Sequence, residues 1–178
     1  MFYFTEIVSP LGQLAAVCDR ECENLVGLWN CGQKHFGGSV KIDMARKDDI
    51  ALFSKLKDWL DSYFNGEKPD AALLPLAPIG GEFRQSVWEE LKKIPYGKTA
   101  TYGEIAGNVA VRLNKRSMSA QAVGGAVGYN PLSIIIPCHR VVGANGSLTG
   151  YAGGLDKKVF LLKHEGADMS KLFLPKSF

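Results

Sequence analysis

A cysteine, a histidine and an arginine follow one another where an apolar run ends, in the stretch IIIPCHRVV. The thiol of Cys138 could act as a nucleophile, but a free thiol has a pKa of about 8.5 and is mostly protonated near neutrality. A reactive cysteine needs a base or a cation nearby, and His139 and Arg140 are the candidates. The alternative is a buried, inert thiol, which is common in protein cores.

A carboxylate farther along the chain could complete this group. Glu165 falls in the last turn of an expected helix, DKKVFLLKHE, where its charge opposes the helix dipole, so a partner such as His139 would account for it. Cys138, His139 and Glu165 can then be read as nucleophile, base and orienting carboxylate. Because neighbours on an extended strand point to opposite faces, the chain must turn near Pro137 for the imidazole to approach the sulfur directly. Cysteine hydrolases use the same arrangement, and the spacing does not choose between the chemistries.

A second group of potential ligands, Cys18, Cys22, Cys31 and His35, lies in the first half. Four nitrogen and sulfur ligands could close a structural zinc site. However, the strand expected over 24–29 puts Cys22 and Cys31 at its opposite ends, roughly 20 Å apart at about 3.3 Å per residue. We therefore expect free thiols, no metal and no cofactor.

Length and composition bound the class of protein. The 178 residues, 46% of them hydrophobic, suffice for one large domain or two small ones. No run approaches the roughly 18 apolar residues of a membrane span, and the N-terminal MFYFTEIVSPLG lacks the pattern of a secretion signal. We expect a cytoplasmic protein, nuclear if its source is eukaryotic, that makes no membrane contact.

The charges are unevenly distributed along the chain. The net charge is only +3, but residues 1–81 carry 8 basic and 11 acidic side chains, whereas residues 82–166 carry 11 basic and 6 acidic ones. The second segment is therefore the part that could face phosphates. A solvated face that happens to be basic is the alternative.

The elements that would position these residues fall into two groups, with a boundary near residue 80 in the Pro- and Gly-rich PDAALLPLAPIGGE. Three short strands over 2–8, 13–18 and 24–29 predict an antiparallel meander. Apolar residues at helical spacing predict a covering helix over 52–64. Residues 1–80 thus form a predicted α/β domain that supports the rest of the chain.

Residues 81–178 read as a mostly α domain. The spacing of Thr101 and Glu104 predicts a capping box at the start of a helix. This helix, a basic connector and a narrow Ala- and Gly-rich helix suggest a helix-turn-helix. Asn145 and Gly146 between β-prone flanks predict a hairpin, the wing of a winged helix. The remaining predicted elements are a helix over 82–94, a strand over 132–136, and a helix from an N-cap at Asp156 to Gly166. The predicted fold class is α+β.

Several motifs resemble one known family. NPLSIIIPCHRVVGANGSLTGYAGG looks like the active-site segment of the O6-alkylguanine-DNA alkyltransferases, and PCHRV is their most specific motif. GLWNCGQKHF, VWEELKKIPYGKTATYGEIA and LLKHEG also resemble family segments. The resemblance covers nearly the whole chain, apart from residues 36–47 and 167–178. It implies direct-reversal DNA repair, in which the alkyl group of O6-alkylguanine, and of O4-alkylthymine, moves irreversibly to the protein in a single turnover.

The resemblance also implies roles for individual residues. Cys138 would accept the alkyl group, and His139, supported by Glu165, would deprotonate the thiol through a bridging water. The hydroxyl of Tyr102 would hydrogen-bond the purine, and Asn130 would tie the recognition helix to the active-site segment. The pocket for the extruded guanine would be lined by Val141, Tyr151 and Ala152.

On the DNA side, the resemblance implies that the narrow helix enters the minor groove of double-stranded DNA while the damaged nucleotide is flipped out. A helix with little side-chain bulk suits a groove only about 6 Å wide. One position departs from the family, which commonly has an intercalating arginine where this chain has Gln121, so the charge of the finger is lost; Arg116 in the connector is a candidate substitute. We expect a monomer, and the sequence leaves open whether its molecules bind DNA cooperatively. The small residues of the helix are Ala120, Ala122, Gly124 and Gly125.

Three other functions are alternatives to DNA repair. A sensor of alkylated DNA with this fold would lack the reactive cysteine, so the intact PCHR disfavours it. A cysteine hydrolase using Cys138 and His139 would turn over, because a thioester hydrolyses and a thioether does not. A winged-helix regulator would leave Cys138 without a role.

Overall fold

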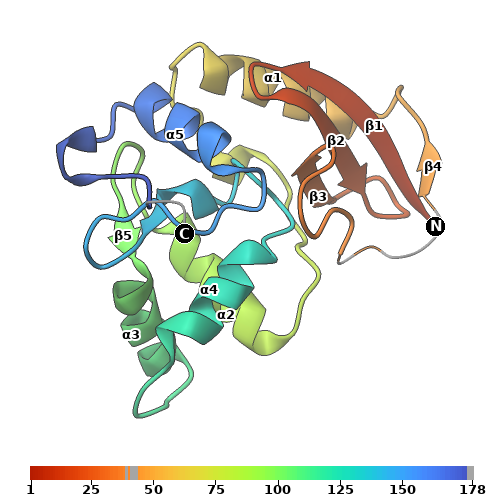
Figure 1. Cartoon of the computed structure of the whole chain (residues 1–178). Helices are drawn as coiled ribbons and strands as arrows, with labels where there is room; N and C mark the ends of the chain where they lie inside the picture. Colours follow the sequence, from red (N-terminus) through yellow and green to blue (C-terminus); the bar gives the residue numbers. More distant parts are fainter. Residues whose placement is uncertain (39, 41–43, 176–178) are drawn as a thin grey trace. The chain divides into compact units, whose positions relative to one another are not determined.

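Figure 1 shows the structure of the protein, a computed structural model that describes residues 1–38, 40 and 44–175. The chain divides into two compact units. The first holds Met1–Ile79 together with Pro131–Ser133, and the second holds Gly80–Asn130 and Ile134–Phe178. Tyr102, Asn130, Cys138, His139 and Glu165, to which the sequence assigns chemistry, all belong to the second unit.

A four-stranded sheet in the order β3-β2-β1-β4 forms the base of the first unit. The strands β1 (Phe2–Ser9), β2 (Gly12–Cys18) and β3 (Leu25–Asn30) make the predicted antiparallel meander. A fourth strand, β4 (Met44–Arg46), pairs parallel to β1 and was not predicted. Its three residues are too few to show the alternation of apolar and polar side chains that identifies a strand.

The helix α1 (Ala51–Phe64) is the predicted covering helix and lies along the sheet (Figure 1). Its apolar residues recur every three or four positions and so form one stripe. The stripe is buried and consists of Leu52, Phe53, Leu56, Trp59, Leu60 and Tyr63. A short 3-10 helix, η1 (Ala71–Leu73), follows, and Leu76 and Leu132 then form isolated bridges to Leu25 and Leu28 of β3.

Three helices that pack on one another form the frame of the second unit: α2 (Glu82–Lys92), α3 (Tyr102–Arg112) and α4 (Ala120–Gly128). Trp88 of α2 is fully buried, and its indole N–H donates to the carbonyl of Ala126 at 3.0 Å. The predicted capping box is present, since Thr101 accepts from the Glu104 amide and Glu104 from the Thr101 amide. This box fixes where α3 begins and therefore where Tyr102 stands.

The prediction of a strand over 132–136 is wrong. These residues are buried, but apart from the single bridge at Leu132 they form turns and a bend, and Ile134 has a φ of 72°, in the left-handed region that no strand residue adopts. A short apolar run indicates burial and does not separate a strand from an irregular buried segment. The turns lead into a 3-10 helix, η2 (Cys138–Arg140), which carries the thiol.

The predicted hairpin over 141–151 is wrong as well. The strand β6 (Val141–Val142) pairs parallel with β5 (Ala100–Thr101). The Asn-Gly pair does make a turn, closed by the Gly143 amide donating to Ser147 O at 2.8 Å, but Ser147 then bridges to Phe173. The dipeptide predicted the turn correctly, whereas the pairing partner lies far along the sequence.

The last long helix, α5 (Leu155–His164), begins earlier than predicted. Gly154, with a φ of 100°, is its N-cap, and Asp156 lies in the first turn instead of capping the helix. Glu165 is the C-cap and Gly166, with a φ of 68°, follows it. A further 3-10 helix, η3 (Met169–Lys171), comes near the end of the chain.

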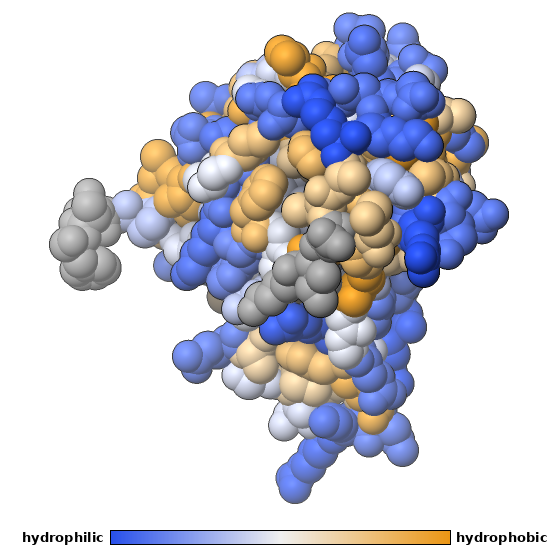
Figure 2. All heavy atoms as spheres, turned by 90° about the vertical axis from the view of Figure 1, so that its right-hand side faces the viewer, coloured by the Kyte–Doolittle hydropathy of each residue, from blue (hydrophilic) through white to orange (hydrophobic). Residues whose placement is uncertain are grey.

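The surface is mostly polar where Figure 2 shows it, with hydrophilic side chains around smaller apolar patches. Single exposed apolar side chains such as Val8 and Val111 are normal for a protein surface. Among the residues with a described placement, no helix is both long enough and apolar enough to cross a membrane.

Candidate active site around Cys138

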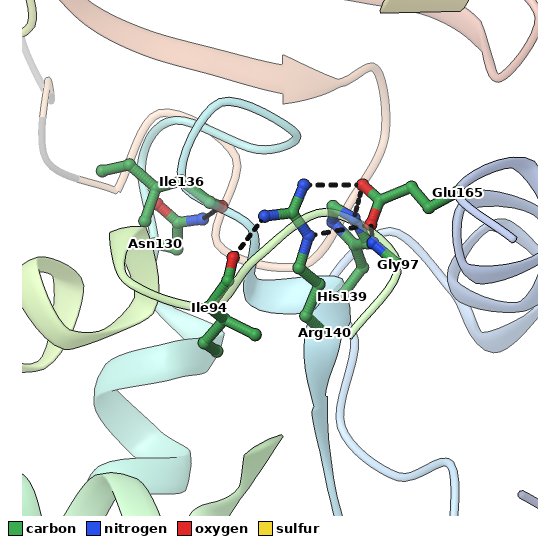
Figure 3. A network of polar contacts seen from close by, with 7 residues as sticks. All are labelled: Ile94, Gly97, Asn130, Ile136, His139, Arg140 and Glu165. Carbon is green, nitrogen blue, oxygen red and sulfur yellow. Dashed lines mark hydrogen bonds and ion pairs between the residues drawn. The ribbon is translucent and has the colours of Figure 1, made fainter. Parts of the chain in front are cut away.

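Glu165 is the centre of a buried polar network (Figure 3). Its Oε1 accepts from His139 Nε2 at 2.7 Å and from Arg140 Nη2 at 2.9 Å. Its Oε2 accepts from Arg140 Nε at 2.8 Å and from the Gly97 amide at 3.1 Å. Burial alone would raise the pKa of this carboxyl, but the hydrogen bonds and charges of His139 and Arg140 hold it well below its usual range. Glu165 is therefore ionised at neutral pH.

Gly97 shows why the network needs glycine at this point. Its φ of 72° is in the left-handed region, and a Cβ there would lie 2.6 Å from the main-chain oxygen of Glu165. Only glycine brings its amide close enough to donate to the carboxylate without a clash. The sequence PYGK thus serves the site as well as ending α2.

His139 is fully buried, and its two ring nitrogens have different surroundings. An ionised carboxylate can only accept, so Nε2 carries the proton donated to Glu165. The other nitrogen, Nδ1, is buried and has no hydrogen-bond partner in the described part of the chain. Burial lowers the pKa of His139, Glu165 raises it, and the charges of Arg140 and Lys158 lower it; the net direction is down. The neutral ring therefore presents Nδ1 as a proton acceptor.

Cys138 is almost completely buried, with 5% of its surface exposed. Burial raises the pKa of its thiol, although the Asn130 side chain, the charge of Lys158 and main-chain groups of residues 138 and 139 lower it in part. The Asn130 amide also donates to the carbonyl of Ile136 at 2.7 Å, and so holds the turn before the cysteine (Figure 3). The resting group is a thiol, so any nucleophilic reaction has to remove its proton.

Lys158 is part of the site and was not predicted. Its side chain is fully buried, and its ammonium donates to the carbonyls of Val141 at 2.6 Å and Thr149 at 2.7 Å. Burial lowers its pKa to about 8, while the interaction with Cys138 acts in the opposite direction. A signal was present in the sequence, because Lys158 lies three and four positions before Leu161 and Leu162 and therefore on the buried face of α5.

Tyr102, at the start of α3, faces the same region. Its hydroxyl lies 3.1 Å from Thr149 O and 3.3 Å from Gly150 O, both of which can accept its proton. Burial, and after it the proximity of Cys138, raise the pKa of Tyr102 to about 12. Its ring lies 3.7 Å from where a Cβ of Gly124 in α4 would be, which brings the narrow helix against the site.

Two family models match the chain. The 6-O-methylguanine DNA methyltransferase DNA binding domain matches residues 82–167, and the ribonuclease-like domain of the same proteins matches residues 2–78. The chain belongs to this methyltransferase family. The resemblance found in its motifs is thereby confirmed.

Full-length relatives support the family assignment. A methylated-DNA–protein-cysteine methyltransferase of Methanosarcina acetivorans is 42% identical over 93% of this chain and 99% of its own length. One of Haemophilus influenzae is 39% identical over 92% of this chain and 86% of its own. Among solved structures, Mycobacterium tuberculosis OGT in complex with DNA aligns with a TM-score of 0.76 at 38% identity, covering 92% of each chain. The α+β fold class is confirmed.

Not all residues that the family suggests lie at the buried site. Val141 is buried and binds Lys158 through its carbonyl, and Tyr151 and Ala152 are half-buried. On α4, the side chains of Ala120, Gln121 and Ala122 are exposed, and Arg116 is exposed in the connector before it.

The cysteines of the first unit form no comparable centre. Cys18 is buried and Cys31 exposed, and burial together with the neighbouring Cys22 raises the pKa of Cys18 to about 12. Within residues 1–38, 40 and 44–175, no three His, Cys, Asp or Glu side chains are grouped so that they could hold a metal ion.

Proposed function

We propose that this protein is a DNA-repair methyltransferase that moves the alkyl group of O6-alkylguanine in DNA to its own Cys138. The observation that carries the proposal is a buried thiol followed directly in the chain by a buried, neutral imidazole, whose Nδ1 has no hydrogen-bond partner among the described residues. Family membership supplies the substrate class, since the related proteins are named for methylated DNA and for a cysteine acceptor.

The reaction balances with the groups described. The Cys138 proton passes through a water to Nδ1 of His139, while Nε2 keeps its hydrogen bond to Glu165 at 2.7 Å. The thiolate sulfur attacks the alkyl carbon, the S–C bond forms, and the bond from that carbon to O6 breaks. Guanine leaves as an anion with the electron pair of the broken bond, and a hydrogen bond donated by the Tyr102 hydroxyl stabilises it. Tyr102 must then exchange its carbonyl partners at Thr149 and Gly150 for the purine.

The product explains why the protein reacts once. A thioether has no leaving group that water can displace, so the alkylated protein does not regenerate. A hydrolase working through Cys138 would instead form a thioester, and the same imidazole would activate the water that cleaves it. Nothing in the described network favours an acyl substrate over an alkyl one, but the relatives are methyltransferases.

DNA binding is assigned to the second unit, around α3 and α4. The exposed Ala120 and Ala122 leave α4 narrow, which suits the minor groove, and Gln121 would occupy the space of the flipped nucleotide. Flipping is required because a buried thiol cannot reach O6 inside a duplex. Arg116 would contact a phosphate. Residues 1–80 act as structural support, and residues 81–178 bind DNA and carry out the transfer.

The same pocket would also take O4-alkylthymine, which presents an alkyl group on a comparable oxygen. Val141, Tyr151 and Ala152 would line it, with the carbonyl of Val141 held in place by Lys158. The protein would act as a monomer and without a cofactor, because the thiol is both acceptor and nucleophile.

The test is the fate of the modified base. Duplex DNA containing O6-methylguanine is incubated with an excess of protein, digested and analysed for O6-methylguanine and guanine. The proposal predicts conversion of the first into the second, lost in Cys138→Ser and retained in Cys31→Ser, the matched change at the exposed cysteine. DNA that keeps its O6-methylguanine with the unmodified protein would refute the proposal.

A further inference from the structure

Arg140 follows His139, the base of the proposed reaction, and hydrogen-bonds the same carboxylate, Glu165. Its guanidinium uses Nε and Nη2 on the two oxygens of Glu165, at 2.8 and 2.9 Å, and Nη1 on the carbonyl of Ile94 at 2.6 Å (Figure 3). Its side chain is 11% exposed, and its cation also lies 5.7 Å from the centre of the Tyr96 ring. A bidentate pair that is anchored at its third nitrogen has a fixed geometry.

The consequence for His139 follows from charge. A buried imidazole facing a lone carboxylate would gain a proton readily, because the ion pair would stabilise the imidazolium. Here the carboxylate already has a permanent cation on both of its oxygens. An imidazolium would add a second positive charge to the pair, and the charge of Lys158 also disfavours it.

We propose that Arg140 is a positioning residue that keeps His139 neutral by taking up the charge of Glu165, so that Nδ1 stays free to accept the thiol proton. Glu165 then orients the ring through Nε2 without protonating it. The direction of the shift in the pKa of His139, downward through burial and through Arg140 and Lys158 against the effect of Glu165, agrees with this role. The ionisable and charged groups around the ring are Glu165 and Lys158 from the α5 region and Cys138 and Arg140 from η2, with Tyr96 beside the pair.

This inference rests on the proposed function for its meaning, but its test needs no DNA. The chain has 3 histidines, so nitrogen-15 NMR of the imidazoles resolves His139 by comparison with a His139→Gln spectrum. In the unmodified protein we expect a neutral ring at pH 7, with the proton on Nε2, and a titration midpoint below the ordinary value. A doubly protonated ring at pH 7 would overturn the proposal without any variant.

Two substitutions separate charge from packing. Arg140→Gln removes the cation, and the His139 midpoint should move to higher pH than in the unmodified protein. Arg140→Lys keeps a cation but cannot bind both oxygens and Ile94 together, and the midpoint should stay near the original one. A folded Gln variant with an unchanged midpoint, or a Lys variant whose midpoint rises, would contradict the role of charge.

The methyl-transfer rate gives a second readout. Removing a charge within about 6 Å commonly shifts a pKa by a unit or more. Transfer by Arg140→Gln should therefore fall about tenfold at the acid end and little at the alkaline end, whereas a purely structural role would lower the rate equally at every pH. If neither the unmodified protein nor the variants transfer methyl groups, the proposed function is refuted. The NMR titration then still decides whether Arg140 keeps His139 neutral. If transfer proceeds but the titration does not shift, only the role of Arg140 is refuted.

Discussion

Replacing Glu165 by glutamine should destabilise the protein strongly, although the two side chains have the same shape. Four donors point at the two carboxylate oxygens, from His139, Arg140 and Gly97. Glutamine has one carbonyl oxygen and one NH2, so in either orientation at least one nitrogen of Arg140 would face another donor. An unsatisfied buried donor costs about 1–3 kcal/mol, and removing one partner of a buried ion pair costs about 3–5 kcal/mol. We expect Glu165→Gln to lower the free energy of unfolding by about 3–5 kcal/mol at pH 7.

The loss should depend on pH in a defined direction. The pKa of Glu165 is lower in the folded protein than its ordinary value of 4.5, so its stabilising effect is complete above that value. As the pH falls through the acid range, the unfolded chain takes up the proton first and the effect is lost. The difference in stability between the unmodified protein and the variant should therefore be largest at neutral pH and shrink below about pH 4.5.

Urea unfolding followed by tryptophan fluorescence measures this difference. The chain has 3 tryptophans, and with Trp29 and Trp59 replaced by phenylalanine the signal reports Trp88 in the second unit. The free energy of unfolding falls by about 1–3 kcal/mol per molar urea, so the urea concentration at the midpoint of unfolding should be lower in the variant by more than about 1 M. The control is Glu89→Gln, which removes a half-exposed ion pair with Lys92 and should change stability by less than about 1 kcal/mol. A loss for Glu165→Gln as small as the control's, or one that persists unchanged in acid, would refute the reasoning.

Three further changes test other parts of the site. Tyr102→Phe should slow methyl transfer by about 10²-fold, as for loss of a proton donor, with DNA affinity by fluorescence anisotropy unchanged; an unaltered rate would exclude the hydroxyl as donor. Gln121→Arg should bind DNA more tightly and steepen the salt dependence by about one charge, and an unchanged slope would mean that this position does not meet DNA. Lys158→Met removes a charge that lowers the pKa of the Cys138 thiol, so the pH profile of transfer should move to higher pH; a profile that stays in place would show that Lys158 only holds the main chain.

The sequence predicted those parts of the fold that local chemistry determines. The capping box at Thr101, the helical stripe over 52–64 and the meander depend on residues close in sequence, and all are present. The prediction of a strand over 132–136 was wrong because burial of apolar residues does not require an extended backbone, and Ile134 adopts a φ of 72°. The turn at Asn145 was correct, but its partner at Phe173 is a long-range contact that no local signal encodes.

For the candidate site, too, the sequence predicted some contacts and missed others. The pairing of His139 with Glu165 was predicted from an unfavourable charge at a helix end and is present at 2.7 Å. The role of Lys158 was missed because a lysine near a helix start is usually exposed, and only its position on the buried stripe marked it. Gly97 could not be predicted, since its amide meets Glu165 only in the folded chain.

The central claim is that Cys138 itself becomes the acceptor of the alkyl group. The most direct measurement is mass spectrometry of the protein after incubation with excess duplex DNA containing O6-methylguanine, as an intact chain and as peptides. We predict the addition of one methyl group per chain, on the sulfur of Cys138, with the exposed Cys31 unmodified. Removal of the methyl group from DNA while Cys138 stays unmodified, or repeated turnover by one molecule, would contradict the account.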